Sequence, residues 1–371
     1  MKANIPVNIP LIGEDEKRLL VECIDSGWIS SEGPFVREFE ERFSNRVGRR
    51  FGVAVTNGTA ALEAALVSLD LCPGDEVILP SNTIISCAQA IVRAGGVPVP
   101  VDCDPVTWNI TSAHVAEAIT PRTRAIMVVH IFGLPVDMEP ILDLVDKHQL
   151  TLIEDAAQAH GQTYRGKPCG SFGLFSTFSF YPNKLITTGE GGMIVTDSAE
   201  VAERCRSLRN LCFQPRRFVH EELGWNLRMT NVQAALGVAQ LPRMDALLKK
   251  KREMGRHYTE HLSDIAGVQL PLASTEYAEN AYWVFGIVLS EDLPFDAAEA
   301  MRRFGENGIG TRPFFWPIHE QPVLRRMGLC GNTVAPVSER IARRGFYIPS
   351  GLGTSRDQMD QVIEVAHQVL R

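Results

Sequence analysis

One lysine, Lys184, lies in the stretch SFYPNKLITTGEGG, between an aromatic run that contains Ser179 and a loop rich in glycine. Most lysines are solvated surface groups, and that is the simplest interpretation of this one. The apolar and aromatic residues before Lys184 instead indicate that its amine enters a partly desolvated cleft. Desolvation lowers the pKa of an amine, and the neutral amine is the nucleophile that forms Schiff bases. The glycines after it allow tight turns where a bound group crowds the chain, and Ser179 offers a hydroxyl to a phosphate.

An acid and an amide follow an apolar run in the segment LIEDAAQAHG, which spans residues 152–161. Asp155 ends this predicted strand, and α/β proteins bind their ligands at the carboxyl ends of strands. Gln158 follows one short turn later. Asp155 would suit a ligand with a basic ring nitrogen, because a carboxylate holds such a nitrogen protonated. The alternative is that Glu154 and Asp155 only cap a following helix.

The segment TNGTAAL, residues 56–62, lies between a predicted strand and an alanine-rich helix. Gly58 allows close approach of the backbone, and Thr59 adds a hydroxyl beside the free N–H groups of a helix start, a combination that holds a phosphate. Taken alone, the segment favours a plain helix cap by Asn57 or Thr59. Neither G-x-x-x-x-G-K-[ST] nor a strand-coupled G-x-G-x-x-G occurs in the chain, which argues against a nicotinamide-dependent oxidoreductase.

Together these features meet four requirements of one cofactor. Pyridoxal 5′-phosphate (PLP) needs a cradle for its phosphate, an acid for its pyridine nitrogen, an amide for its phenolic oxygen and a lysine for its aldehyde. In that order the candidates are Gly58, Thr59 and Ser179, then Asp155, Gln158 and Lys184. Because no Cys/His cluster has zinc spacing, no metal site is expected.

Short apolar runs alternate with helical periods from Phe51 to Val195. The predicted strands are FGVAVT, DEVILP, VPVPVD, RAIMVVHIF, LTLIED, STFSF and GGMIVTD, and helical segments such as TAALEAALVSL and MEPILDLVDKHQ separate most of them. Strands that are apolar throughout indicate a sheet covered by helices on both faces. The β-then-α order predicts an α/β protein with a mostly parallel, doubly wound sheet.

A long helical stretch starts near Thr230 and is expected to bend at Pro242. It carries the chain into a smaller α+β unit with a strand at residues 281–289 and a closing helix. We predict a large PLP-binding domain over residues 1–250 and a small C-terminal domain over residues 251–371, with an N-terminal segment that could pack on the small domain.

The overall composition excludes several classes of protein. The 371 residues are 45% hydrophobic and 22% charged with a net charge of -7, which suits a globular enzyme and argues against nucleic-acid binding. The most basic run, KKKREMGR at residues 249–256, is expected to be a solvated helix face. No apolar run approaches the roughly 20 residues that span a bilayer, and the N-terminus shows no secretion signal. We expect the eight cysteines to be reduced, mostly buried side chains of a cytoplasmic protein.

Seven longer motifs occur in one order along nearly the whole chain: GWISSEGPFVREFEERF, TNGTAAL, PGDEVILPS, IEDAAQAHG, TFSFYPNKLITTGEGG, GWNLRMTNVQAALG and TRPFFWPIH. In these motifs the chain resembles the DegT/DnrJ/EryC1/StrS family of PLP-dependent nucleotide-sugar aminotransferases. The GWISS, NKLITTGEGG and RMTNVQAA segments are most similar to those of GDP-perosamine synthases. The resemblance implies the fold-type-I aminotransferase fold, with a mixed, mostly parallel seven-stranded sheet flanked by helices and a smaller C-terminal α+β domain.

The resemblance also implies roles for individual residues, matched by position. Lys184 would bind the aldehyde of PLP and move the proton on the substrate carbon. Asp155 would pair with the pyridine nitrogen, and Gln158 would touch the ring hydroxyl oxygen. The implied phosphate contacts are Gly58, Thr59 and Ser179.

Other positions concern the substrate and the partner subunit. The resemblance implies that Asn226, in GWNLRM, reaches the phosphate of the neighbouring subunit, so that a homodimer shares its active sites. Arg312 and His319, in TRPFFWPIH, fall where the family contacts the nucleotide sugar; the alternatives are a surface charge and a satisfied polar side chain. Ile84 occupies a position that often holds an aromatic residue stacked on the cofactor ring, and it could cover the ring at a loss on the order of 1 kcal/mol. Asn82 departs from the leucine common in perosamine enzymes.

The implied reaction is transamination from L-glutamate to a keto group of a nucleotide-linked sugar, of the 4-keto-6-deoxy, GDP-perosamine type used in lipopolysaccharide O-antigen. The base (GDP, UDP, dTDP or CDP) and the position (C3 or C4) stay open. One alternative is a sugar dehydratase of the same fold, in which a histidine replaces the lysine at position 184. Another is a non-catalytic PLP-binding regulatory protein, although such a protein would not need Lys184, Asp155, Gln158 and Ser179 together.

Overall fold

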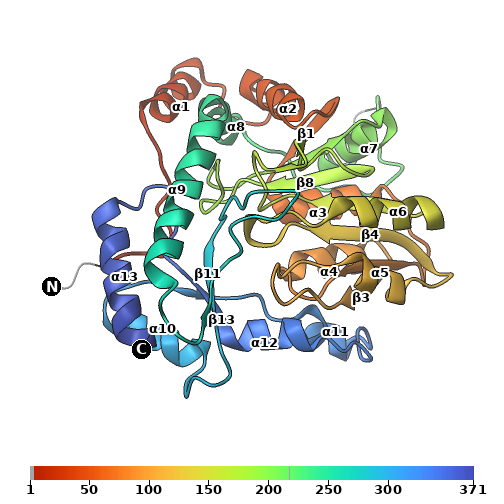
Figure 1. The fold of residues 1–371 in the computed structure, drawn as a ribbon. Helices are drawn as coiled ribbons and strands as arrows, with labels where there is room; N and C mark the ends of the chain where they lie inside the picture. Colours follow the sequence, from red (N-terminus) through yellow and green to blue (C-terminus); the bar gives the residue numbers. More distant parts are fainter. Residues whose placement is uncertain (1–3, 217) are drawn as a thin grey trace.

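The computed structural model describes residues 4–216 and 218–371 and shows two α/β units joined by a long bent helix (Figure 1). The larger unit is built on a seven-stranded sheet and the smaller one on a four-stranded antiparallel sheet. This arrangement confirms the α/β class with a smaller C-terminal α+β part.

The large sheet has the strand order β1-β9-β8-β5-β4-β2-β3. In that order the strands are Phe51–Val55, Gly192–Thr196, Phe175–Ser179, Thr151–Asp155, Thr123–Val129, Glu76–Pro80 and Val97–Val101. Strand β9 pairs antiparallel with both β1 and β8, and the other neighbours pair in parallel. The sheet is therefore mixed but mostly parallel, as the resemblance implied, with β9 as the one reversed strand.

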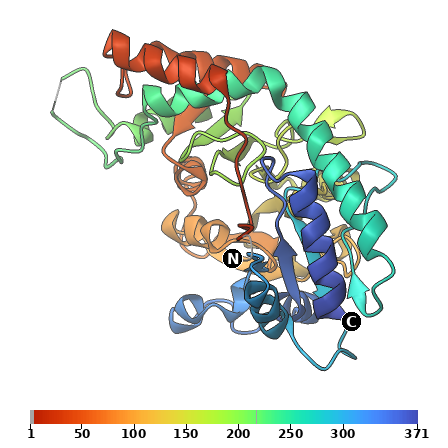
Figure 2. The same ribbon diagram turned by 90° about the vertical axis from the view of Figure 1, so that its left-hand side faces the viewer.

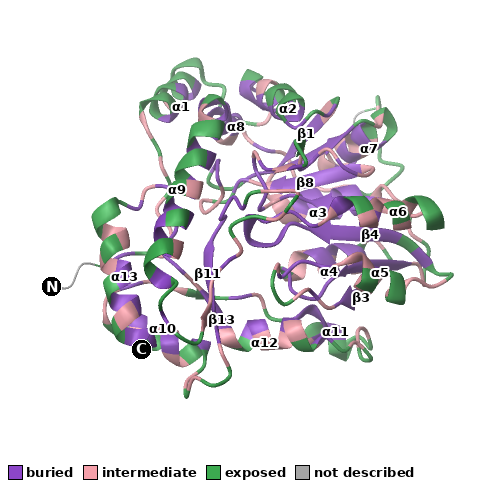
Figure 3. Ribbon diagram, viewed as in Figure 1, coloured by how far each residue is buried: buried purple, intermediate pink, exposed green. Residues whose placement is uncertain are grey.

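Both faces of this sheet are covered, because successive strand residues enter different cores. On β4, Met127 packs with helices α3, α4 and α7, whereas Ile126 and Val128 pack with α5 and α6. On β1, Ala54 faces α1, α2 and α8. The helices are α1 (Glu14–Ser26), α2 (Pro34–Arg46), α3 (Gly58–Val67), α4 (Ile85–Arg93), α5 (Ser112–Ala118), α6 (Met138–His148) and α7 (Ala199–Arg209). Figure 3 shows the strands as the most buried elements, which explains their unbroken apolar runs.

The bent helix consists of α8 (Asn231–Gln240) and α9 (Met244–Leu262), separated by a 3-10 turn that contains Pro242. Thr230 caps α8 by accepting a hydrogen bond from the Gln233 backbone N–H. Both the start and the interruption of this helix were predicted from the sequence, since proline removes a donor from the helix interior.

The smaller unit contains the sheet β10-β11-β13-β12. Its strands are β10 (Val268–Gln269), β11 (Phe285–Leu289), β12 (Arg312–Pro313) and β13 (Gly345–Ile348), and its helices are α10 (Ala297–Glu306), α11 (Pro322–Arg326), α12 (Pro336–Arg344) and α13 (Arg356–Leu370). A short hairpin of β6 (Thr163–Tyr164) and β7 (Lys167–Pro168) and two further 3-10 turns, Ile131–Gly133 and Ile318–Glu320, complete the described elements. The predicted strand at residues 281–289 begins later, at Phe285.

The N-terminal segment runs from α1 to the small unit, where Ile5 forms a bridge with Ile309 and is fully buried (Figure 2). Along α9, Leu248 belongs to the core of the large unit and Met254 to that of the small one. We therefore propose that the domain boundary lies within α9, between these two residues. None of the helices in residues 4–216 and 218–371 is long and apolar enough to cross a membrane.

Gly192 is the first residue of β9, and a substitution there tests how closely this reversed strand must approach the start of α3. A Cβ at this position would lie 2.2 Å from the carbonyl oxygen of Asn57 and 2.9 Å from the amide nitrogen of Gly58. Because neither backbone atom can move independently, we expect Gly192→Ala to reduce the free energy of unfolding by roughly 1–3 kcal/mol.

The matched control is Gly305→Ala in α10, where an added Cβ meets no atom within 4 Å. Alanine there should stabilise the helix by roughly 0.5–1 kcal/mol. Urea unfolding of both variants measures the difference, and a Gly192→Ala variant as stable as wild type would contradict the close-approach argument.

Candidate active site

A cleft of about 690 Å³ opens at the carboxyl ends of the parallel strands. The first turn of α3 follows β1, α4 follows β2, Asp155 ends β5 and Ser179 ends β8. Of the residues predicted from the sequence, those that line the cleft are Gly58, Thr59, Ile84, Asp155, Gln158, Ser179 and Lys184. Lining residues that the sequence did not single out include Ser86, Arg93, Tyr181, Asn183, Trp283, Phe315 and Tyr347.

The start of α3 combines a helix cap with an anion site. The Oδ1 atom of Asn57 accepts a hydrogen bond of 2.8 Å from the Ala60 backbone N–H, so the capping interpretation was right for Asn57. Gly58 and Thr59, in the first turn of α3, line the cleft, and the positive end of the helix dipole there favours an anion. A Cβ at Gly58 would lie 2.7 Å from the Cβ of Ser179, so only glycine lets α3 approach the end of β8 this closely.

Asp155 is buried, with 3% of its surface exposed. Its Oδ1 atom accepts a hydrogen bond of 3.0 Å from the Ala157 N–H, and its Oδ2 atom accepts one of 3.3 Å from the Cys87 thiol. Burial raises the pKa of Asp155, and these two hydrogen bonds together with the nearby Lys184 charge act in the opposite direction. No helix follows β5 directly, so the alternative that Asp155 caps a helix is wrong.

Gln158 is held by an unusual backbone conformation in the turn after β4. Phe132 has a φ of 54°, in the left-handed region, and its N–H donates a hydrogen bond of 2.6 Å to Oε1 of Gln158. Since the carbonyl oxygen of the amide is thereby used, its NH₂ group remains as the donor for a ligand. A donor is what a phenolic oxygen of a bound ring would require.

Lys184 presents its amine to an aromatic ring. Its Nζ atom lies 3.9 Å from the centroid of the Trp283 ring. Burial lowers the pKa of Lys184 to about 7, while the carboxyl of Asp155 acts in the opposite direction. Lys184 is half-buried and lines the cleft, which agrees with the partly desolvated position expected from the sequence. A neutral amine at this pKa is a competent nucleophile.

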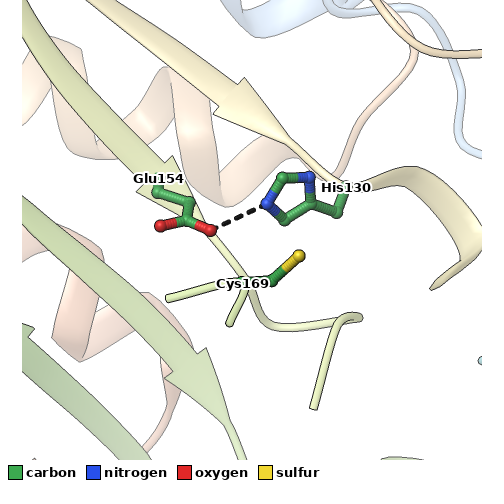
Figure 4. A group of neighbouring side chains, drawn as sticks. All are labelled: His130, Glu154 and Cys169. Atoms are coloured by element: carbon green, nitrogen blue, oxygen red, sulfur yellow. Dashed lines mark hydrogen bonds and ion pairs between the residues drawn. The ribbon is translucent and has the colours of Figure 1, made fainter. Parts of the chain in front are cut away.

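Glu154 points away from the cleft, on the opposite side of β5 from Asp155. Its carboxylate accepts hydrogen bonds from the backbone of Gly170 and Phe172, from the Ser176 hydroxyl and, at 2.8 Å, from His130 Nε2 (Figure 4). The His130 Nδ1 atom accepts the Val136 N–H, so the proton must reside on Nε2. His130 and the backbone N–H groups of Gly170 and Phe172 lower the pKa of Glu154 against the effect of its burial. All four donors anchor the strand that carries Asp155.

Gly189 of GEGG has a φ of 78° and fits the expected tight turn, whereas the other two glycines have a different role. Gly191 and Gly192 are crowded by other parts of the chain: Thr188 and Met229 at the first, the start of α3 at the second. Gly192 lets β9 pack against the start of α3, and contacts within the chain account for both glycines.

Three predicted residues lie outside this cleft. Arg312 is exposed and lines an adjoining hollow of about 280 Å³ that shares Tyr181 and Trp283 with it. Asn226 is exposed and forms a backbone bridge with Asn210. His319 is buried, and its ring nitrogens contact the Ser81 hydroxyl at 2.7 Å and Glu339 at 3.1 Å. The structure thus places His319 as a satisfied polar side chain, and its contact with substrate stays a prediction.

The basic run on α9 contains one exception to the expected solvated face. Lys249 and Lys250 are exposed, but Lys251 is 4% exposed. Its Nζ atom donates hydrogen bonds to the carbonyl oxygens of Trp283 and Ser350, and burial lowers its pKa to about 7. The expectation for the run is therefore wrong at this residue, because helix periodicity turns one of three adjacent lysines inward.

The cleft has the chemical groups that PLP requires. Its phosphate would meet the α3 amides and the Ser179 hydroxyl, its ring nitrogen a buried carboxyl, and its aldehyde a desolvated amine. Ile84 also lines the cleft, at the start of α4, where it could cover a ring face. The residues present therefore fit the cofactor implied by the resemblance.

Comparison with known proteins agrees with this fit. The sequence pattern of the DegT/DnrJ/EryC1/StrS aminotransferase family matches residues 10–367. A GDP-perosamine synthase of Caulobacter vibrioides is 40% identical over 367 residues, covering 99% of this chain and 98% of that relative. The crystal structure of the aminotransferase TlmJ from Streptoalloteichus hindustanus superposes with a TM-score of 0.91 at 30% identity, covering 99% of this chain and 98% of that one. Spr1654 of Streptococcus pneumoniae in its PLP form gives a TM-score of 0.91 at 26% identity, covering 99% and 100%.

The pKa of Lys184 predicts how its reactivity depends on pH. In the protein freed of cofactor, labelling of Lys184 by an amine-reactive ester should level off above about pH 8, because the neutral amine predominates above a pKa of about 7. Mass spectrometry of the labelled peptides measures this, with the exposed Lys250 as internal reference. Labelling that still rises steeply beyond about pH 9 would show that the amine is not desolvated.

The same shift affects stability. Because the pKa of Lys184 falls from 10.5 to about 7 on folding, the unfolded chain binds more protons between these values. The free energy of unfolding should therefore rise with pH across that window, and Lys184→Met should flatten part of the rise. Urea unfolding of the cofactor-free protein at several pH values measures both slopes.

Proposed function

Because this chain belongs to the DegT/DnrJ/EryC1/StrS aminotransferase family, we propose that it moves an amino group from L-glutamate to a keto group of a nucleotide-linked sugar. Its cofactor is pyridoxal 5′-phosphate. The observation that carries the proposal is that one cleft brings together Lys184, Asp155 and the first turn of α3. An amine, an acid and an anion site are three of the four groups that PLP requires of a protein, and Gln158 in the same cleft supplies the fourth.

PLP supplies a reactive aldehyde and a ring that withdraws electrons from the substrate carbon. Lys184 would bind that aldehyde as a neutral amine and, once released, carry the proton to and from the reacting carbon. Asp155 would keep the ring nitrogen protonated; a cation opposite its buried carboxyl favours the ionised form that burial alone disfavours. Gln158 would donate its amide N–H to the ring oxygen.

We propose that the acceptor is a GDP-linked 4-keto-6-deoxy sugar and that its product enters lipopolysaccharide O-antigen. The GDP-perosamine synthase relative, 40% identical, supports this choice. Arg312, beside the cleft, could bind the charged part of such a substrate. Ile84 lines the cleft and can adjust substrate fit directly, whereas Asn82 is buried and donates to the Trp108 carbonyl oxygen at 3.4 Å, so its effect would be indirect.

We also propose a cytoplasmic homodimer with shared active sites. Asn226 lies next to Leu227, which lines the cleft, and three residues from Leu223, which is 93% exposed. An exposed leucine of this kind favours burial against a second subunit. In such a dimer Asn226 would reach the partner's phosphate site. A sugar dehydratase of this fold is disfavoured, because it would carry a histidine where this chain has Lys184.

The substrate assignment is tested with a panel of keto-sugar nucleotides that varies the base and the position of the keto group. Each is incubated with PLP-loaded enzyme and L-glutamate, and the products are read by mass. Conversion to an amino sugar, fastest with the GDP-linked 4-keto sugar, is expected. Release of 2-oxoglutarate without amination of any member would contradict the sugar assignment, and removal of a hydroxyl without amination would indicate a dehydratase.

Replacing the amine tests the role of Lys184 directly. We expect Lys184→Ala to lose turnover, because no other lysine lines the cleft among the described residues, while PLP still binds without a covalent link. Absorbance spectra and turnover assays measure both properties, and Lys250→Ala is the control on an exposed lysine. A variant that keeps normal turnover would refute the role.

A further inference from the structure

Trp283 contacts Lys184 with the face of its ring. The ring lines the active-site cleft, the adjoining hollow beside Arg312 and an inner cavity behind Lys184. Only 8% of its surface is exposed. The Lys184 amine lies over its face, 3.9 Å from the ring centroid, which is the geometry of a cation–π contact.

Three contacts of its side chain fix the orientation of this ring. The indole Nε1–H donates a hydrogen bond of 3.0 Å to the carbonyl oxygen of Asn183, the residue that precedes Lys184. Phe132 and Phe315 lie nearly parallel to the indole, at interplanar angles of 17° and 11° and centroid separations of 6.2 and 6.4 Å. The indole is thus tied to the same short segment whose amine it faces.

The backbone of Trp283 is held by the buried lysine of α9. Lys251 donates hydrogen bonds of 3.0 Å to the Trp283 carbonyl oxygen and 2.5 Å to that of Ser350. Its acceptors are carbonyl oxygens and not carboxylates, so burial of this amine is not compensated by an ion pair. Methionine or leucine at position 251 would fill the same volume without the cost of burying an amine. The two hydrogen bonds from Lys251 therefore suggest that its role is to position the backbone of Trp283.

We propose that Trp283 is a further catalytic residue that holds the free Lys184 amine on its indole face, and that Lys251 is the positioning residue that keeps the indole in place. The proposal rests on the proposed role of Lys184 as the amine that carries PLP and moves the proton. Lys184 must leave the cofactor during every transamination half-reaction, and the indole face offers the released amine a defined resting place.

The physical effect is a balance of influences on one amine. Burial favours the neutral form of Lys184, whereas the carboxyl of Asp155 and the negative face of an indole both favour the ammonium form. Together they hold the amine between base and acid, which is what a group that both takes and gives a proton requires. Other titratable side chains that face or share its surroundings are Asp155, His160, Glu63, Arg93, Tyr181, Glu190, Lys251 and Tyr347.

The effect of each substitution follows from this balance. Trp283→Leu removes the π face and should lower the pKa of Lys184 by roughly 0.5–1.5 units, a three- to thirty-fold loss of proton affinity. Lys251→Met keeps the buried volume but loses both carbonyl contacts, so it should shift the pKa in the same direction by less. Lys251→Arg keeps a donor and should retain the wild-type value. Lys250→Met, on the exposed face of the same helix, is the matched control.

The experiment measures the pKa of Lys184 in each cofactor-free variant by pH-dependent amine labelling, read peptide by peptide, and compares it with the pH profile of kcat in the loaded enzymes. Parallel downward shifts in Trp283→Leu and Lys251→Met, with Lys250→Met unchanged, are the expected result. An unchanged pKa in Trp283→Leu would overturn the proposal. A raised pKa would overturn it too, because the indole would then only exclude water. A wild-type pKa and profile in Lys251→Met would overturn the positioning role.

Two features keep the outcomes distinct. If Lys251→Met melts below the assay temperature, Trp283→Phe takes its place. This variant keeps an aromatic face but loses the hydrogen bond to the Asn183 carbonyl oxygen, so the pKa of Lys184 should lie between those of wild type and Trp283→Leu. An unchanged pKa of Lys184 in Trp283→Phe would overturn the positional argument. Failure of the proposed function would instead appear as turnover in Lys184→Ala, while the titration of Lys184 in the cofactor-free protein would still be readable.

Discussion

The carboxyl of Asp155 is buried and the amine of Lys184 is partly desolvated in the same cleft, and this shared desolvation is the constraint on which the site depends. Burial alone shifts both groups toward their neutral forms, lowering the pKa of the amine and raising that of the acid. A ligand that brings a basic nitrogen to the acid and an aldehyde to the amine relieves both costs at once. The site is therefore complementary to PLP before the cofactor binds.

Much of the surrounding structure serves to hold these two groups in place. Strand β5 turns Asp155 to the cleft and Glu154 to the opposite side, where four hydrogen-bond donors satisfy the second carboxylate. The reversed strand β9 approaches the start of α3 so closely that a Cβ at Gly192 would clash with the backbone of Asn57. Because each of these contacts is made by the chain itself, the cradle for the phosphate and the position of the acid are set by folding.

The fold and the inner part of the site could be predicted from the sequence because their signals are local. Unbroken apolar runs indicated a covered sheet, Pro242 marked the bend between α8 and α9, and Asp155 and Lys184 stood out against apolar neighbours. Trp283 and Lys251 carried no such signal. A tryptophan within an apolar run is typical of a core, and one lysine among three is typical of a surface. Their roles arise only when α9 and the segment before β11 meet beside Lys184, which is a tertiary contact.

For His319 the alternative of a satisfied polar side chain describes its surroundings better than a substrate contact does, since both its ring nitrogens are engaged within the chain.

The most direct test of the account is chemical trapping of the cofactor link. The purified protein is loaded with PLP, reduced with borohydride, digested and mapped by mass spectrometry. We predict one phosphopyridoxyl adduct, on the peptide that contains Lys184. An adduct on the peptide of Lys251, the other amine whose pKa is lowered to about 7, would contradict the central claim that Lys184 is the amine that carries the cofactor. So would the absence of any adduct in a yellow, PLP-loaded protein.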